Sequence, residues 1–140
     1  KLDDTAAILF SSGSEGTPKG IELSHRNIMG NIKQAITLIN PNDNDVMLGT
    51  LPIFHSFGLT VTTLLPLIEG IPVVCHSDPT DGFGIGKMAA KYEASMLFAT
   101  ATFFRLYTRN KKLHPLMFKN LRIVIAGAEK LPQEIRDAFK

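Results

Sequence analysis

The segment FSSGSEGTPKG at residues 10–20 gathers small and hydroxyl residues around one lysine, directly after an apolar run at residues 6–10. Glycines let a backbone approach a ligand closely, hydroxyls supply hydrogen-bond donors, and a lysine supplies a positive point charge. The residues of these kinds are Ser11, Ser12, Gly13, Ser14, Gly16, Thr17, Lys19 and Gly20. Together they predict a loop that suits a polyphosphate, with a flexible surface turn as the alternative.

The spacing of this loop differs from that of the phosphate loop in P-loop NTPases. That template needs a lysine directly after its last glycine, followed by Ser or Thr. Here Pro18 precedes Lys19, and Gly20 follows it. The sequence therefore predicts a phosphate-binding loop of another kind and disfavours a phosphotransferase or an NTPase of the P-loop type.

Two other segments place chemically active residues shortly after apolar runs. His55 lies in LPIFHSFG, after a run that ends at Leu51, and Gly127 lies in IAGAEKL, after a run that ends at Ala126. A neutral imidazole can donate a hydrogen bond where charge develops. Taken alone, His55 would be a packed polar residue and Gly127 would belong to an ordinary turn between a strand and a helix.

Short apolar runs alternate with helical patterns along the whole chain. We expect helices over residues 24–39, with Ser24 as the N-cap and Pro41 after the end, over 57–68, around 88–92, over 102–109, and from Pro132 onward. We expect strands at residues 6–10, which should be buried, and at 46–51, 71–75, 96–99 and 121–126.

This alternation predicts an α/β fold in which a parallel sheet carries helices on both faces, because parallel neighbours need crossover connections. Ligands of such sheets bind beyond the carboxyl ends of the strands. The loop at 10–20, the segment with His55 and the segment with Gly127 all follow strands. We therefore expect these three loops to meet around one crevice.

Composition fits one globular unit with a core: the chain has 140 residues, of which 44% are apolar and 20% charged, and a formal net charge of +2. No basic stripe with interleaved aromatic residues is present, so nucleic acid is not an expected partner. The single cysteine, Cys75, cannot form an internal disulfide, which favours a reducing environment, and we expect it to pack in the core.

A protein-ligated metal is not expected, because the four histidines are scattered and one cysteine completes no zinc set. The longest apolar stretch, residues 59–68, is interrupted by threonines and a proline and is too short to cross a bilayer by itself.

Two further segments have ordinary interpretations beside more specific ones. HSDPTD at residues 76–81 has the H-x4-D spacing of glycerolipid acyltransferases, but Pro79 and Gly82 indicate a turn. RNKKLHPLMFKN at residues 109–120 is either a basic membrane-surface segment or a solvated helix end and loop. We favour the second interpretation, in which Leu116, Met117 and Phe118 return to the core.

The segments ILFSSGSEGTPKG, LSHRNI, LPIFHSFG and IAGAEKL resemble, in order and separation, those of the adenylate-forming enzymes: acyl-CoA synthetases, luciferases and peptide synthetase adenylation domains. GSEGTPKG, FHSFGLT and AGAEKL are most similar to the acyl-acyl-carrier-protein synthetase half of the bacterial bifunctional 2-acylglycerophosphoethanolamine acyltransferase. The resemblance covers essentially all 140 residues but only part of the family's large N-terminal domain. The small C-terminal domain with the catalytic lysine is expected beyond Lys140, so this chain alone should not catalyse the reaction.

The resemblance implies a two-step reaction. A fatty acid carboxylate attacks the α-phosphate of ATP, giving an acyl-adenylate and pyrophosphate, and the acyl group then passes to the thiol of acyl carrier protein. Coenzyme A is the acceptor in the alternative, a long-chain acyl-CoA synthetase, and a non-catalytic nucleotide-binding module is the remaining possibility. Membrane phospholipid is an implied partner of the full protein, on the cytoplasmic side of the bacterial inner membrane.

The resemblance also assigns residues. His55 would border the acyl pocket and the α-phosphate, and Thr100, Thr102 and Phe103 would be candidates for the acyl pocket. Mg²⁺ would arrive with ATP, and its protein ligand would lie beyond residue 140. Glu15, where most relatives have threonine, would face solvent or help to hold Mg²⁺. The β- and γ-phosphates would be held by Ser11, Ser12, Gly13, Ser14, Gly16, Thr17 and Lys19, and the adenine would be bordered by Gly127, Ala128 and Glu129.

Overall fold

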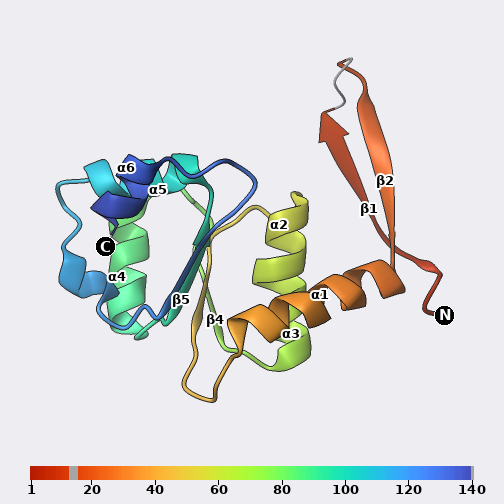
Figure 1. Cartoon of the computed structure of the whole chain (residues 1–140), viewed down its shortest axis with the longest axis horizontal. Helices are drawn as coiled ribbons and strands as arrows, with labels where there is room; N and C mark the ends of the chain where they lie inside the picture. The colour runs from red at the N-terminus through yellow and green to blue at the C-terminus, as the bar shows by residue number, and fades with distance from the viewer. Residues whose placement is uncertain (13–15, 140) are drawn as a thin grey trace.

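The computed structural model describes residues 1–12 and 16–139. A four-stranded parallel sheet with the strand order β4-β3-β5-β6 forms the centre, and a two-stranded antiparallel hairpin projects away from it (Figure 1). The strands of the parallel sheet are β3 (Met47–Gly49), β4 (Val73–Cys75), β5 (Met96–Ala99) and β6 (Ile123–Ala126). The predicted parallel sheet is confirmed, with β3, β4 and β6 shorter than the apolar runs that indicated them.

Helices lie on both faces of this sheet, as the alternation along the chain predicts (Figure 1). One group of helical segments comprises α1 (His25–Ile39), α2 (Ser56–Leu59), the π-helical turn η1 (Thr60–Leu64) and α3 (Leu65–Glu69). The other comprises α4 (Gly82–Lys91), α5 (Ala101–Arg109), the 3₁₀ turn η2 (Pro115–Phe118) and α6 (Gln133–Ala138). The connection from each parallel strand to the next is thus made by helix.

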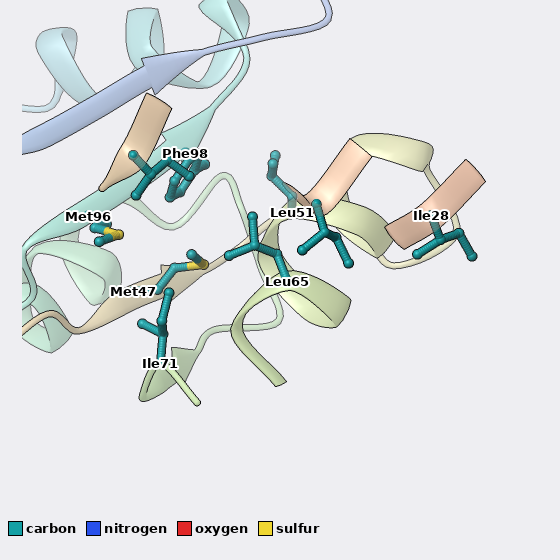
Figure 2. Packing of buried hydrophobic residues seen from close by; sticks show 9 residues of the cluster. Ile28, Met47, Leu51, Leu65, Ile71, Met96 and Phe98 are labelled. Atoms are coloured by element: carbon teal, nitrogen blue, oxygen red, sulfur yellow. The ribbon is translucent and has the colours of Figure 1, made fainter. Parts of the chain in front are cut away.

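Successive side chains of the strands belong to two different cores. Met96 and Phe98 of β5 pack in the cluster that contains α1 residues, as does Met47 of β3 (Figure 2). Leu97 and Ala99, the alternate residues of β5, pack in the cluster with α4 and α5. A strand buried on both faces is a continuous apolar run, which is why its sequence does not alternate between apolar and polar residues.

Helix α1 ends where its sequence predicts. Ser24 Oγ accepts a hydrogen bond from the Asn27 backbone N–H at 3.1 Å, and Asn27 Oδ1 accepts one from the Ser24 N–H at 3.0 Å. At the other end, Asn40 adopts a left-handed conformation with φ 45°, and Pro41 follows. Between these caps, Ile28, Ile32 and Ile39 form the buried stripe.

The hairpin corrects the predicted environment of the first strand. β1 (Thr5–Ser12) includes the predicted residues 6–10, but it pairs antiparallel with β2 (Pro18–Ser24) and is not part of the parallel sheet. Its side chains are mostly exposed, with Phe10 72% exposed, so the expectation of a buried strand is wrong. Ala7 and Leu23 reach the core, whereas Phe10 faces away from it. β2 was not predicted, because residues 18–24 have no apolar run.

Two smaller expectations are also wrong. Cys75 is exposed, because it ends β4, an edge strand of the sheet. Pro132 is the N-cap of α6 and not its first helical residue. The helix predicted over 102–109 is confirmed, because α5 ends at Arg109. The helix predicted around 88–92 is confirmed in part, because α4 contains Met88 and Ala89 but ends at Lys91. The predicted segment 57–68 is helical throughout, but its middle, η1, is a π-helical turn.

An ion pair between the buried Asp45 and the partly exposed Arg122 joins the amino ends of three parallel strands. Asp45 is 2% exposed, and its carboxylate accepts hydrogen bonds from Ser95 Oγ at 2.6 Å and from Arg122 Nε at 2.8 Å. The Arg122 guanidinium lowers the pKa of Asp45 to about 2. These residues precede β3, β5 and β6, so this network holds the edge of the sheet opposite to the predicted ligand crevice.

Candidate functional site

His55 begins the helix that follows β3. Its Nδ1 accepts a hydrogen bond from the Phe57 backbone N–H at 3.2 Å, which caps α2. A neutral imidazole that accepts at Nδ1 carries its proton on Nε2. His55 is exposed, so this Nε2–H is presented outward at the carboxyl edge of the sheet as a hydrogen-bond donor.

Close packing requires a glycine at position 58, in LPIFHSFG. A methyl group built at Gly58 would lie 2.0 Å from the Pro52 carbonyl oxygen, a distance that no real contact shows. The carbonyl of Gly58 accepts the hydroxyls of Thr62 and Thr63 at 3.0 Å and 2.9 Å. Gly58 therefore lets α2 start directly against the Pro52 turn, and this close approach fixes where His55 lies.

The loop after β6 packs against the loop after β3. A methyl group at Gly127 would lie 2.6 Å from Phe57 Cε1, so only glycine lets this backbone reach the ring. The Gly127 N–H donates to the Ala99 carbonyl at 3.1 Å. Ala128 has φ 64°, in the left-handed region that a residue with a side chain rarely adopts. The structure thus brings together the predicted segments around His55 and Gly127.

Glu129 clamps the same loop to the start of α5. Its carboxylate accepts the Thr102 backbone N–H at 2.9 Å and the Thr102 hydroxyl at 2.9 Å. Thr102 lies in the first turn of α5, where an anion is stabilised by the free backbone N–H groups. Because these hydrogen bonds occupy its carboxylate, Glu129 holds the loop after β6 in place. Gly127 and Ala128 then present their backbone at the carboxyl edge of the sheet.

The hairpin presents the predicted phosphate-binding residues at its far end. Ser11 of β1 lies opposite Lys19 of β2, Ser12 lies opposite Pro18, and Gly16 has φ 80° in the turn. All of these residues are exposed. Within residues 1–12 and 16–139, the side chains of the predicted donors make no hydrogen bond or ion pair; these donors are Ser11, Ser12, Thr17 and Lys19. The predicted residues Gly13 and Ser14, and also Glu15, lie outside the described residues.

Two of the three loops expected at one crevice come together, and the loop of the hairpin is the third. The first strand was expected to be part of the parallel sheet, and this is wrong, because in the part of the chain that the structure describes β1 pairs with β2 alone. The loops after β3 and β6 and the first turn of α5 do come together. The approach of the hairpin to them stays a prediction.

The interpretation of HSDPTD as a turn is confirmed. Asp81 is the N-cap of α4, and its Oδ1 accepts the Gly84 N–H at 2.9 Å. This hydrogen bond lowers the pKa of Asp81, and His76 Nε2 lies 3.0 Å from the other carboxylate oxygen. The pair therefore supports a helix start.

Sequence reasoning missed the residues that support the site: Phe57 and Gly58, and the role of Glu129 as a clamp. The glycines in LPIFHSFG and IAGAEKL were the available signal, because a glycine beside bulky residues often marks a close approach. The part of the chain that the structure describes has no group of three His, Cys, Asp or Glu side chains that could hold a metal ion. It also has no helix whose length and apolar content would let it cross a membrane.

Comparison with known proteins identifies the family. The model of the family described as AMP-binding enzyme matches residues 1–140, so the chain belongs to the AMP-binding enzymes. It is 33% identical over 141 residues to a probable 4-coumarate–CoA ligase of Dictyostelium discoideum, covering 98% of this chain and 25% of that protein. It is 28% identical over 141 residues to a long-chain-fatty-acid–CoA ligase of Yersinia pestis, with the same coverage.

A solved structure confirms the arrangement of the elements. ATP-bound MatB from Rhodopseudomonas palustris superposes with a TM-score of 0.82 at 26% identity, covering 99% of this chain and 27% of that one. The chain therefore spans about a quarter of the length of the relatives that it matches.

Proposed function

We propose that the chain is part of the N-terminal domain of an ATP-dependent acid–thiol ligase, which activates a fatty acid as an acyl-adenylate. The observation that carries the proposal is the joined edge of the parallel sheet. There Gly127 packs against Phe57, beside the outward Nε2–H of His55, in a chain that matches the AMP-binding family along its whole length. A ligand at the carboxyl ends of parallel strands would meet this edge.

In the first step, an oxygen of the fatty acid carboxylate forms a bond to the α-phosphorus of ATP, and pyrophosphate leaves. The two reactants are anions, so positive charge and oriented donors near the phosphates are what the protein must supply. The exposed, unpaired side chains of Ser11, Ser12, Thr17 and Lys19 fit this need. We assign to them, with Gly13, Ser14 and Gly16, the β- and γ-phosphates that leave as pyrophosphate.

His55 has a donor role in this proposal. With Nδ1 accepting the Phe57 N–H, the neutral ring offers Nε2–H to the oxygen that gains charge at the α-phosphate. Its neighbours Ile53 and Phe54 are 65% and 77% exposed, so the same segment presents apolar surface for an acyl chain. His55 would thus stand between the acyl group and the phosphate.

Gly127 and Ala128 are assigned to the adenine. Phe57 fills the space that a side chain at Gly127 would need, so a purine would lie against the peptide backbone of this loop and the small side chain of Ala128. Glu129 supports this surface through Thr102 and is a positioning residue. The assignment predicts that these positions change the KM for ATP more than the rate of acyl transfer.

The second step passes the acyl group to a thiol, and here two acceptors are proposed. The similarity of GSEGTPKG, FHSFGLT and AGAEKL to acyl-acyl-carrier-protein synthetases favours acyl carrier protein, in the reacylation of phospholipid. The names of the relatives, which are CoA ligases, favour coenzyme A. A C-terminal domain with the catalytic lysine, and a protein ligand for Mg²⁺, would be supplied by other parts of the full protein.

ATP–pyrophosphate exchange by the full protein tests this function. We expect exchange that depends on a fatty acid, because the first step is reversible and needs no thiol. An NTPase or a non-catalytic nucleotide-binding module would give no such exchange. Single-turnover transfer from the acyl-adenylate to acyl carrier protein or to coenzyme A then decides the acceptor.

A further inference from the structure

Basic residues are concentrated in one part of the chain. Residues 94–128 contain six of the fifteen Lys and Arg residues and none of the thirteen Asp and Glu residues. One of the six, Arg122, forms an ion pair with Asp45 at the amino edge of the sheet. The other five lie between the middle of α5 and Lys119, the residue after η2, so the excess of positive charge has a definite place in the fold.

Four of these cations lie within seven residues of one exposed leucine, Leu116, in the sequence. The segment from the end of α5 to the end of η2 lies at the opposite end of the molecule from the hairpin (Figure 1). We call five exposed residues in and beside this segment the basic tip: Arg109, Lys111, Lys112, Leu116 and Lys119. In the described part of the chain, none of its four cations makes an ion pair or a side-chain hydrogen bond.

The apolar residues of this segment divide in a way that the sequence did not predict. A methyl group at Gly86 of α4 would lie 2.4 Å from Leu113 and 2.9 Å from the Met117 sulfur, so both of these side chains pack on α4. The ring of Phe118 lies beside that of Phe139, with centroids 6.0 Å apart and the ring planes tilted by 45°. Leu116 does not return to the core and is 67% exposed.

We propose that the basic tip docks on an anionic membrane surface. Lysines with long apolar stems hold their charge at headgroup level while one leucine enters the acyl boundary. A protein partner is less well matched, because protein interfaces are depleted in lysine and enriched in aromatic residues, and the tip has three lysines and no aromatic residue. Docking would bring a fatty-acid-activating enzyme to the surface where its substrate is concentrated.

The magnitude expected is modest, because each lysine near an anionic surface strengthens binding about fivefold. Binding of the full protein should therefore be reversible and should weaken with salt, since the attraction falls off within a Debye length. This inference goes beyond the proposed function, and the membrane assay needs neither ATP nor a fatty acid.

Co-sedimentation of the full protein with vesicles tests the proposal. We expect binding to vesicles of phosphatidylcholine mixed with phosphatidylglycerol, and little binding to phosphatidylcholine alone or at high salt. The variant K111Q/K112Q should bind the mixed vesicles about twentyfold more weakly. L116S should lose about threefold, because one partly inserted leucine contributes less than its full transfer energy.

The control is K1Q/K33Q, which removes the same charge from two exposed lysines outside the basic tip and should bind as the wild type does. Pyrophosphate exchange in solution, without vesicles, should be unchanged in K111Q/K112Q, which separates docking from the proposed chemistry. Equal binding to both kinds of vesicle, or wild-type binding by K111Q/K112Q, would overturn the proposal. So would normal vesicle binding by that variant together with a selective loss of transfer to acyl carrier protein, since this would make the tip a protein-docking surface.

Discussion

At the carboxyl edge of the parallel sheet, the contact of Phe57 with Gly127 and the Thr102–Glu129 pair hold neighbouring loops together. The hairpin, by contrast, reaches the core through Ala7 and Leu23, and the side chains at its far end are exposed. The part of the candidate site at the carboxyl edge of the sheet is thus built by packing. The part on the hairpin consists of exposed hydrogen-bond donors.

This difference separates two kinds of effect. A substitution at the packed edge changes the fold and the site together, because the same contacts serve both. A substitution at the hairpin removes a donor that the folded chain does not use, so it should change ligand binding and leave stability alone. Measuring the free energy of unfolding and the activity of the full protein therefore distinguishes the two kinds of effect.

Gly58→Ala should have the largest effect. Its new methyl group would lie 2.0 Å from the Pro52 carbonyl oxygen, and a backbone atom cannot move aside as a flexible side chain can. We expect a loss of about 3 kcal/mol or more in the free energy of unfolding, measured with urea. Gly30→Ala is the control, because nothing lies within 4 Å of its new methyl group on α1. That change should stabilise the protein by up to about 1 kcal/mol. Similar results for the two variants would refute the packing role of Gly58.

Asp45→Asn tests the opposite edge of the same sheet, which charge holds together. The pKa of Asp45 is lowered from 3.8 to about 2 in the folded chain, so its contribution to stability is present above pH 4 and is lost as the pH falls toward 2. We expect the wild type to lose up to about 2 kcal/mol over this range from Asp45, discounted because Arg122 is partly exposed.

Asp45→Asn should be less stable than the wild type at neutral pH. It should also lack the loss of stability that the titration of Asp45 causes as the pH falls from 4 toward 2. Urea unfolding between pH 5 and pH 2 measures both quantities. Asp43→Asn, which removes an exposed carboxylate from the same loop, should leave the curve unchanged. A wild-type slope in Asp45→Asn would show that another group titrates in this range.

The two edges of the parallel sheet show which features the sequence could predict. Apolar runs such as 96–99 and the caps around α1 are local signals, and they predicted the strands, the helices and the fold class. The contacts of Gly127 with Phe57 and of Asp45 with Arg122 join segments distant in the chain, so only the three-dimensional arrangement identifies these partners.

The expectation that residues 6–10 form a buried strand is wrong for a related reason. Residues 6–10 resemble a buried strand, because an apolar run does not say which of its faces will be covered. Residues 18–24 form a strand through pairing with β1, although their own pattern gives no signal. Strand formation depends on neighbours more than on intrinsic preference, and the order of residues in the chain does not show which neighbour is present.

Glu129→Gln should have an intermediate effect at the packed edge. The amide keeps one acceptor but loses the charge at the start of α5 and the second acceptor for Thr102. We expect a loss of about 1 kcal/mol in stability and a severalfold higher KM for ATP in pyrophosphate exchange, with kcat little changed. Glu134→Gln, the same change on the exposed first turn of α6, is the control. A fall in kcat at unchanged KM would contradict a positioning role.

Lys19→Ala should give the smallest change in stability and test the hairpin most directly. Lys19 is exposed, and within the described residues its amine has no partner, so we expect less than about 0.5 kcal/mol of change in urea unfolding. Fatty-acid-dependent pyrophosphate exchange should nevertheless fall about tenfold, because a charge facing the phosphates is removed. Lys33→Ala on α1 removes an equally exposed lysine and should change neither quantity. If Lys19→Ala lowered stability and activity in parallel, the hairpin would be part of the packed core of the full protein. If neither changed, the phosphates would not depend on Lys19, and the backbone of the turn would be left as their ligand.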